Sequence, residues 1–274
     1  MNKITLIGID TAKSVFHMVG IDRHGKYVWR KKVTRRKLVS TLAQLEPCKV
    51  VLEACGASYH WARQINAGGH DARLIAPQHV KPYRRGQKND YRDAEAIISA
   101  SLSPGIHFVG IKTTGQQAEQ ALHRVRSRLL SHCNAAANEL RGLLGEYGCT
   151  FALGHKALRA GALAFIDSGQ AEALGLVELI TDVLEEMKYL EQRLQHYERQ
   201  IEQRVKVDAV SSRMREELSG VGVLSASALR VKVADARDFG DGRNFAAYLG
   251  MAPGHRGTGG KVKIGKIRRN HDRY

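Results

Sequence analysis

Four acidic residues have the types and positions that metal-dependent chemistry requires. Asp10 and Glu53 each end a short apolar run that has the composition of a buried strand. Asp90 and Asp93 are three residues apart and come just before an apolar helical pattern. Carboxylates at the ends of buried strands are costly to keep charged unless a cation lies between them. In a chain of net charge +16, this set indicates divalent metal ions and a polyanionic substrate.

The elements that position these acids follow a recognisable order. Hydrophobic periodicity and turn residues predict strands at 4–9, 14–21, 27–33, 49–53 and 72–75, and helices at 36–45, 59–67 and 91–102. Three antiparallel strands followed by alternating helices and strands is the order of an α/β RNase H-like domain. In such a sheet the strands that end at Asp10 and Glu53 are parallel neighbours, so we expect their side chains to meet at one edge.

The pair Asp90 and Asp93 is expected to share one face at the start of a helix. A helix that crosses the sheet edge brings Asp93, and with it Asp90, to the other two acids. Each acid alone also fits a structural role, with Asp90 as an N-cap and Asp93 as a charge in the first helical turn. Oxygen ligands from several elements are what Mg²⁺ accepts, and two such ions about 4 Å apart stabilise both oxygens of a phosphoryl displacement.

The sequence therefore predicts a catalytic site that binds Mg²⁺ or Mn²⁺. Its predicted ligands are the four acids, Asp10, Glu53, Asp90 and Asp93. The histidines, His17 among them, show no metal-ligand spacing and are interpreted as core or surface residues.

Composition restricts the partners and the compartment. The 274 residues include 43 Lys and Arg against 27 Asp and Glu, an excess typical of nucleic-acid-binding proteins. No apolar run approaches the ~20 residues of a spanning helix, and no signal peptide is evident, so a cytoplasmic protein without membrane contact is expected. The four cysteines form no C-x-x-C pair and are interpreted as reduced thiols, neither a zinc site nor a disulfide framework.

The middle of the chain is predicted to be helical, over 114–147 and 174–206. The second helix carries an apolar residue at alternating spacings of three and four: Ile180, Val183, Met187, Leu190, Leu194, Tyr197 and Ile201. This pattern fits two packed helices of a bundle, or an antiparallel coiled coil that also forms a homodimer or homotetramer. The expected domains are 1–110 (catalytic), 111–207 (helical coiled coil) and 208–274 (mostly α, C-terminally short).

The last domain has two features that suit nucleic acid. Gly220 and Gly222 form a turn between helical segments, as in a helix–hairpin–helix, where backbone amides approach a phosphate. The stretch from Pro253 to Tyr274 is Gly-rich and basic, and is expected to be a disordered tail or a loop on DNA phosphates. The candidate nucleic-acid-binding residues are Arg84, Arg85, Lys88, Gly220, Gly222, Arg256, Lys261, Lys263 and Lys266.

Several motifs resemble the IS-one-ten family of insertion-sequence transposases, which includes the pilin-gene DNA invertase. They are Gly8-Ile9-Asp10, Leu52-Glu53-Ala54, Lys88–Ile97, Ser219–Gly222, Ala246–Pro253 and Gly259-Gly260-Lys261. The resemblance covers nearly the whole chain. It implies a RuvC-like domain with the four acids as DEDD residues, a coiled-coil link and a C-terminal transposase domain. It also implies DNA cleavage and rejoining, DNA as the partner and, for some members, an element-encoded guide RNA.

The resemblance fails at one catalytic position. The family pattern has a Ser-Ser pair where this chain has Gly257 and Thr258, so Thr258 is the candidate nucleophile. Its methyl group crowds an in-line attack. Three alternatives stay open: a Holliday-junction nuclease, a DNA-binding relic without catalysis, and, with least support, a sugar-kinase or actin-like ATPase.

Overall fold

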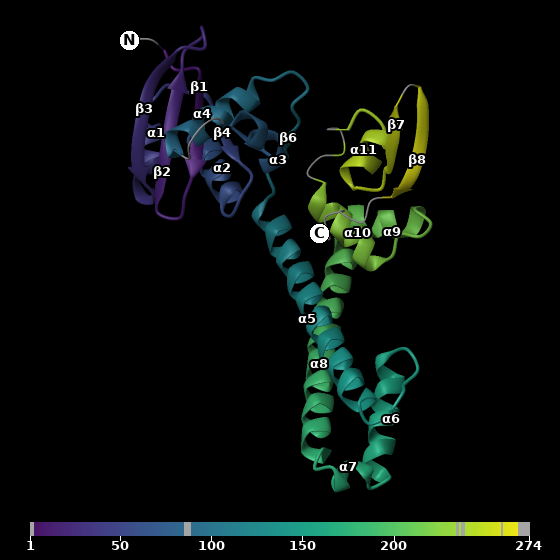
Figure 1. Ribbon diagram of the computed structural model, residues 1–274. Coiled ribbons are helices and arrows are strands. Elements are labelled where there is room, and N and C mark those ends of the chain that lie inside the picture. Colours follow the sequence, from purple (N-terminus) through teal and green to yellow (C-terminus); the bar gives the residue numbers. More distant parts are fainter. Residues whose placement is uncertain (1–2, 85–88, 234–235, 237–238, 259, 268–274) are drawn as a thin grey trace. The chain divides into compact units, whose positions relative to one another are not determined.

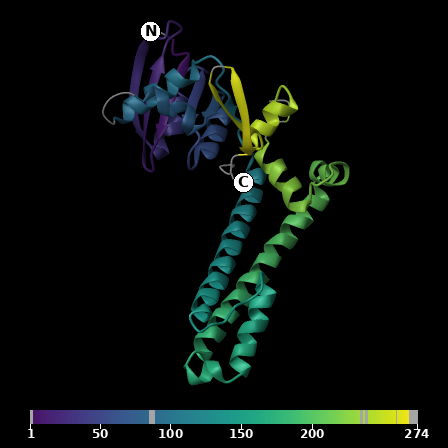
Figure 2. The same cartoon turned by 45° about the vertical axis from the view of Figure 1, so that its right-hand side comes forward.

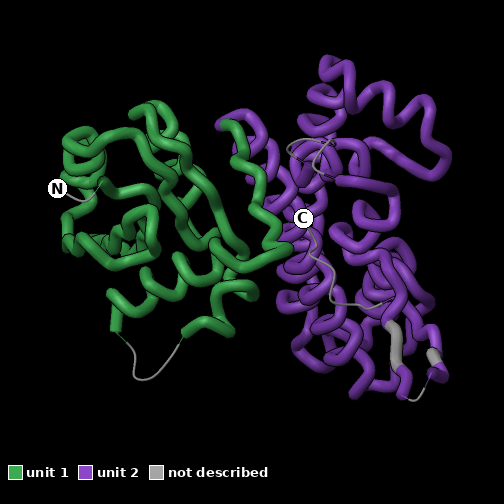
Figure 3. Tube along the Cα trace, turned by 90° about the horizontal axis from the view of Figure 1, so that it is seen from above, with its two compact units in different colours: residues 1–113 green, residues 114–274 purple. Residues whose placement is uncertain are grey.

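The computed structural model describes residues 3–84, 89–233, 236, 239–258 and 260–267. The chain divides into two compact units, residues 1–113 and 114–274 (Figure 3). Each unit is described by itself below. The division of the second unit at residue 208, expected from the sequence, stays a prediction.

The first unit contains a six-stranded mixed sheet of order β3-β2-β1-β4-β5-β6 (Figure 1). Its strands are β1 (Leu6–Thr11), β2 (Val15–Ile21), β3 (Tyr27–Thr34), β4 (Lys49–Glu53), β5 (Asp71–Ile75) and β6 (Phe108–Val109). β1, β2 and β3 are antiparallel, whereas β1, β4 and β5 are parallel. The predicted mixed α/β domain is confirmed. β6 was not predicted; it has two residues and pairs antiparallel with β5.

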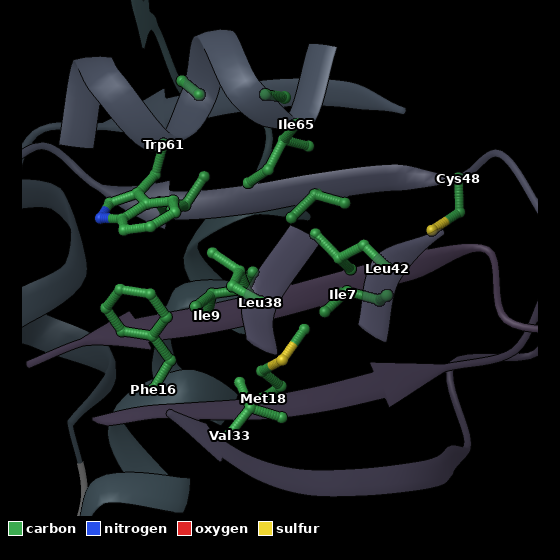
Figure 4. Close-up of a cluster of buried hydrophobic side chains, with 14 of the residues drawn as sticks. Ile7, Ile9, Phe16, Met18, Val33, Leu38, Leu42, Cys48, Trp61 and Ile65 are labelled. Carbon is green, nitrogen blue, oxygen red and sulfur yellow. The ribbon is translucent and has the colours of Figure 1, made fainter. Parts of the chain in front are cut away.

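Helices cover both faces of this sheet. One face packs against α1 (Leu38–Leu42) and α2 (Ser58–Ala67), and Figure 4 shows this core. The other face packs against α3 (Pro77–Val80) and α4 (Asp90–Ser101). Between α3 and α4 lies the short 3₁₀ helix η2 (Lys81–Tyr83). The helix predicted over 36–45 is shorter, because a 3₁₀ turn, η1 (Arg35–Lys37), precedes α1 and the helix ends at Leu42.

Alternation along β1 decides which face each side chain joins. Ile7 and Ile9 belong to the core under α1 and α2, and Leu6 belongs to the core under α4. Gly8 and Asp10 therefore share the α4 face. A Cβ atom on Gly8 would lie 2.4 Å from the carbonyl oxygen of Ala94, so only glycine lets the backbone of α4 pack this closely on β1.

The second unit is mostly helical. α5 (Thr114–Gly145) and α8 (Val177–Val207) are long and lie side by side (Figures 1 and 2). The predicted apolar seam of α8 is largely buried, with Ile180, Met187, Leu190 and Ile201 in its core positions. The sequence interpretation missed α6 (His155–Asp167) and α7 (Gln170–Ala173). α6 packs against both long helices.

The remaining elements of this unit are α9 (Ala209–Glu217), α10 (Val223–Lys232), α11 (Gly242–Tyr248), β7 (Pro253–Thr258) and β8 (Lys261–Ile267). β7 and β8 form an antiparallel hairpin. The expectation of a disordered tail or an irregular loop from Pro253 onward is therefore wrong over this hairpin. Among the described residues, every helix is too short or too polar to span a lipid bilayer.

Candidate functional site

The sheet brings Asp10 and Glu53 to the same edge. β1 and β4 are parallel, and Ile9 lies beside Leu52 in the register, so the residues that follow them are neighbours. Alternation places both carboxylates on the α4 face. The side chain of Glu53 is only 16% exposed. The arrangement expected from the sequence for these two acids is the arrangement that the structure has.

The start of α4 supplies the other two acids. Asn89 is the N-cap, since its side chain accepts a hydrogen bond from the backbone N–H of Tyr91 at 3.0 Å. The structural role considered for Asp90, an N-cap, is therefore taken by Asn89. Asp90 and Asp93 are in the first turn, where the positive end of the helix dipole favours anions. Their position near Asp10 follows from the close packing of α4 on β1 at Gly8.

Arg84 connects two of the acids. Its NH2 nitrogen donates to Glu53 Oε2 at 2.7 Å, and its Nε lies 3.2 Å from Asp93 Oδ1. The Asp93 side chain is 19% exposed and that of Arg84 is 45% exposed. A guanidinium group thus lies between carboxylates from β4 and α4. Arg84 was predicted as a nucleic-acid-binding residue, and the structure places it as an ion-pair partner of the acids.

The electrostatics of Asp10 reflect how closely the acids gather. Burial raises the pKa of the Asp10 carboxyl above its ordinary value. The negative charges of Asp93, Asp90 and Glu53 raise this pKa further, in that order, and His17 opposes them. A carboxyl group whose charged form is disfavoured by burial and by three other acids gains most when a cation binds beside it.

His17 is a member of this site that sequence reasoning missed. It pairs with Asp10 across β1 and β2, and one ligand atom each from Asp10, His17 and Asp90 lie within 4.8 Å of one another. The buried His17 Nδ1 lies 3.5 Å from Asp90 Oδ2 and makes no hydrogen bond within the described part of the chain. The tight turn between β1 and β2 was the available signal, because antiparallel pairing aligns Asp10 with His17.

The other predicted residues lie elsewhere. Gly220 has a positive φ of 83° and Gly222 is the N-cap of α10, so the predicted turn between two helices is present. Lys261, Lys263 and Lys266 are exposed on β8, and Arg256 is on β7. Arg85 and Lys88 lie outside the described residues.

Thr258 is exposed at the end of β7 and pairs with Lys261 across the hairpin. It belongs to the second unit, whereas the four acids belong to the first.

Comparison with known proteins finds two family models along the chain, the first of which extends beyond the first unit into α5. Residues 7–149 match a family model for a DEDD transposase domain, described as "Transposase". Residues 213–274 match the model described as "Transposase IS116/IS110/IS902 family". An α/β domain with an acidic sheet edge, followed by this second domain, defines the class of DEDD transposases.

Similar proteins align with almost the whole of this chain. A "Probable family 20 transposase" of Pseudomonas aeruginosa is 41% identical, over 99% of this chain and 80% of the relative. The transposase for insertion sequence element IS1111A of Coxiella burnetii is 37% identical, over 99% and 75%. That for IS1328 of Yersinia enterocolitica is 34% identical, over 100% and 81%. The chain belongs to the IS110 family of insertion-sequence transposases, the family that its motifs resemble.

Proposed function

We propose that this transposase cuts and rejoins the DNA of an insertion sequence with Mg²⁺ or Mn²⁺ held by Asp10, Glu53, Asp90 and Asp93. The observation that carries the proposal is the meeting of these acids, from β1, β4 and α4, at one edge of the sheet. The strand order, with an antiparallel meander next to parallel strands, is compatible with an RNase H-like, RuvC-like domain. Family membership supplies the substrate class, since transposases act on DNA.

The residues at this edge fit a divalent metal ion. All four acids offer oxygen atoms, which Mg²⁺ and Mn²⁺ prefer. The guanidinium of Arg84 already lies between Glu53 and Asp93, which shows that this position attracts a cation. When bound, the metal stabilises negative charge on the attacking and leaving oxygens of a phosphoryl transfer.

The protein's own groups then have separate tasks. Glu53 and Asp93 would hold the metal in place of their contacts with Arg84, and the guanidinium would then be available to a DNA phosphate. His17 lies next to Asp90 and Asp10, and it limits the orientations that their carboxylate groups adopt. Exposed lysines of β8 bind further DNA phosphates. The backbone amides at the start of α10 bind phosphates as well, as in a helix–hairpin–helix formed by α9 and α10.

Two parts of the proposal come from the family resemblance. The first is Thr258 as the nucleophile that forms a covalent link to DNA, with a hydroxyl group in place of the family's serine. The second is an element-encoded guide RNA. A homodimer or homotetramer is proposed from the heptad spacing along α8, whose core residues also pack within the chain against α5 and α6.

The test supplies the protein with the DNA that flanks its element and Mg²⁺, and looks for a covalent protein–DNA adduct on a denaturing gel. We expect an adduct that Thr258→Ala removes, that Thr258→Ser retains, and that Asp93→Asn removes. The matched control is Asp71→Asn, an exposed acid at the opposite end of the neighbouring strand β5.

Each other outcome overturns a stated part. DNA binding without cleavage by the wild-type protein, in Mg²⁺ and in Mn²⁺, contradicts the enzyme and supports a relic. Cleavage of branched DNA without an adduct supports a junction nuclease. An adduct that persists in Thr258→Ala contradicts the role of Thr258 alone.

A further inference from the structure

A second group of potential metal ligands lies within the helical unit, away from the acids. Cys133 on α5, His155 at the start of α6 and Glu191 on α8 each place one ligand atom within 4.8 Å of the others. Cys133 is buried, and the other two are half-buried. Each of the three residues therefore comes from a different helix.

The distance between His155 and Glu191 is long for a strong hydrogen bond, whereas that between His155 and Cys133 is ordinary for a hydrogen bond to sulfur. His155 Nδ1 is 3.6 Å from Cys133 Sγ and 3.3 Å from Glu191 Oε1. Strong N–H···O bonds are shorter, at about 2.7–3.2 Å. Zinc bonds of about 2.3 Å to sulfur and about 2.0–2.1 Å to nitrogen or oxygen, at tetrahedral angles, separate S from N by about 3.6 Å and N from O by about 3.3 Å. The two observed distances from His155 Nδ1 match those expected for a tetrahedral zinc site, and the third ligand atom pair lies within 4.8 Å.

Neighbouring side chains orient two of the three ligands. Asn134 Oδ1 lies 3.0 Å from His155 Nε2, so a ring that donates from Nε2 to this oxygen would leave its Nδ1 lone pair for a metal ion. Arg159 donates to Glu191 Oε2 at 2.8 Å, which leaves Oε1 facing His155. A histidine whose second nitrogen is held by an oxygen, and a carboxylate whose second oxygen is held by a donor, are the usual surroundings of metal ligands.

Without a metal, this arrangement is less favourable. A neutral His155 directs a lone pair at the Glu191 carboxylate, and only a proton or a cation between them makes the contact attractive. Burial raises the pKa of the Cys133 thiol, and Glu191 adds to that effect, so metal binding must release the thiol proton. The competing interpretation is an imidazolium ion paired with Glu191, beside a protonated thiol.

We propose that Cys133, His155 and Glu191 bind one Zn²⁺ ion, with water as the fourth ligand. The ion ties α6 to the pair formed by α5 and α8. This proposal is independent of DNA cleavage, and it revises the interpretation of all four cysteines as simple reduced thiols. Sequence inspection missed it because Cys133 and His155 are 22 residues apart and Glu191 is on another helix, so no local motif exists.

The experiment uses the full chain, purified without a histidine tag and freed of metal by a chelator. Co²⁺ is titrated in place of zinc, because a thiolate bound to Co²⁺ gives a charge-transfer absorption in the near ultraviolet. We expect one Co²⁺ per chain with this band, displacement by Zn²⁺, and loss of the band in Cys133→Ser. Cys149→Ser, which changes a half-buried cysteine of the same unit, should keep the band.

Further measurements separate the two interpretations. His155→Gln should weaken Zn²⁺ binding more than about tenfold, and Zn²⁺ should raise the thermal unfolding temperature of the wild-type chain but not of Cys133→Ser. Absence of the thiolate band in the wild-type protein overturns the proposal whether or not any variant folds. A band that survives in Cys133→Ser, with native circular dichroism, overturns it as well.

Discussion

The two groups of potential metal ligands differ in donor atoms and surroundings. At the sheet edge the four acids offer oxygen, and Asp90 is 57% exposed. In the helical unit Cys133, a buried residue, offers sulfur and His155 offers nitrogen. An arginine pairs with a carboxylate in each group, Arg84 with Glu53 and Arg159 with Glu191.

This difference indicates two kinds of site. Oxygen ligands at an accessible edge suit Mg²⁺ or Mn²⁺ and leave room for a DNA phosphate, which catalysis requires. Sulfur and nitrogen ligands between packed helices suit Zn²⁺ and add stability. The arginines also differ, because Arg84 ion-pairs with two acids, Glu53 and Asp93, whereas Arg159 donates to the Glu191 oxygen, Oε2, that is not the one near His155.

The largest expected effect separates catalysis from structure. Asp10→Asn and Asp93→Asn each remove a metal ligand and should lower the rate of DNA cleavage by more than about 100-fold, since even indirect supports of a metal site are worth 10–100-fold. Cys133→Ser should leave the rate unchanged at a temperature where the variant is folded, because Cys133 belongs to the other unit and is not a ligand at the acidic site. Cleavage of a labelled element end in single-turnover conditions measures both. Equal losses of cleavage rate in the two acid variants and in Cys133→Ser would contradict the separation of a catalytic site from a structural one.

A smaller effect is expected from the hairpin, which belongs to neither group. Replacing Lys261, Lys263 and Lys266 by alanine should weaken DNA binding at all sequences alike. A plot of the logarithm of the association constant against the logarithm of the salt concentration has a negative slope. The magnitude of this slope should decrease by about three, one for each phosphate contact that is lost. Fluorescence anisotropy at several salt concentrations measures the slope. An unchanged slope would remove the hairpin from the DNA-binding surface.

Arg84→Ala tests whether the guanidinium occupies the position of a metal ion. Two ion pairs of a partly exposed arginine together contribute about 1 kcal/mol, so their removal should strengthen Mn²⁺ binding by about threefold to tenfold. Isothermal titration calorimetry gives the affinity. The control is Arg30→Ala, which breaks an ion pair with Glu95 elsewhere on α4. Weaker Mn²⁺ binding in Arg84→Ala would show that Arg84 supports the site instead.

The smallest effect concerns stability and pH in the absence of metal. The raised pKa of Asp10 means that the folded state disfavours the charged carboxylate. The contribution of the Asp10 carboxyl to stability is fully present below its ordinary pKa of 3.8 and is lost as the pH rises through the higher folded pKa. Asp10→Asn should therefore unfold a few degrees higher than wild type at pH 7 in EDTA, and the difference should shrink toward pH 4. A lower unfolding temperature at pH 7 would contradict this account.

Local patterns predicted much of the first unit. Asp10 and Glu53 follow apolar strands, and the strand order puts those strands side by side, so their meeting could be foreseen. Contacts that depend on the path of the chain between elements could not be predicted. The ion pairs of Arg84 depend on how the segment after α3 turns back, and the position of His17 depends on the length of one turn.

The second unit was harder to predict for related reasons. Gly and Lys residues dominate the stretch from Pro253 onward and concealed the alternation of Lys and apolar residues that forms β8. The site of Cys133, His155 and Glu191 is assembled by the packing of α6, a helix that was not predicted, against two helices that were. Periodicity indicates a buried face but does not show which polar residues meet beside it.

The central claim is that the four acids form one metal site, and Mn²⁺ binding followed by electron paramagnetic resonance tests it most directly. The account predicts that Asp10→Asn, Glu53→Gln, Asp90→Asn and Asp93→Asn each weaken Mn²⁺ binding, while Asp71→Asn and Cys133→Ser bind as the wild type does. Wild-type Mn²⁺ affinity in all four acid variants, each with a native circular dichroism spectrum, would contradict it.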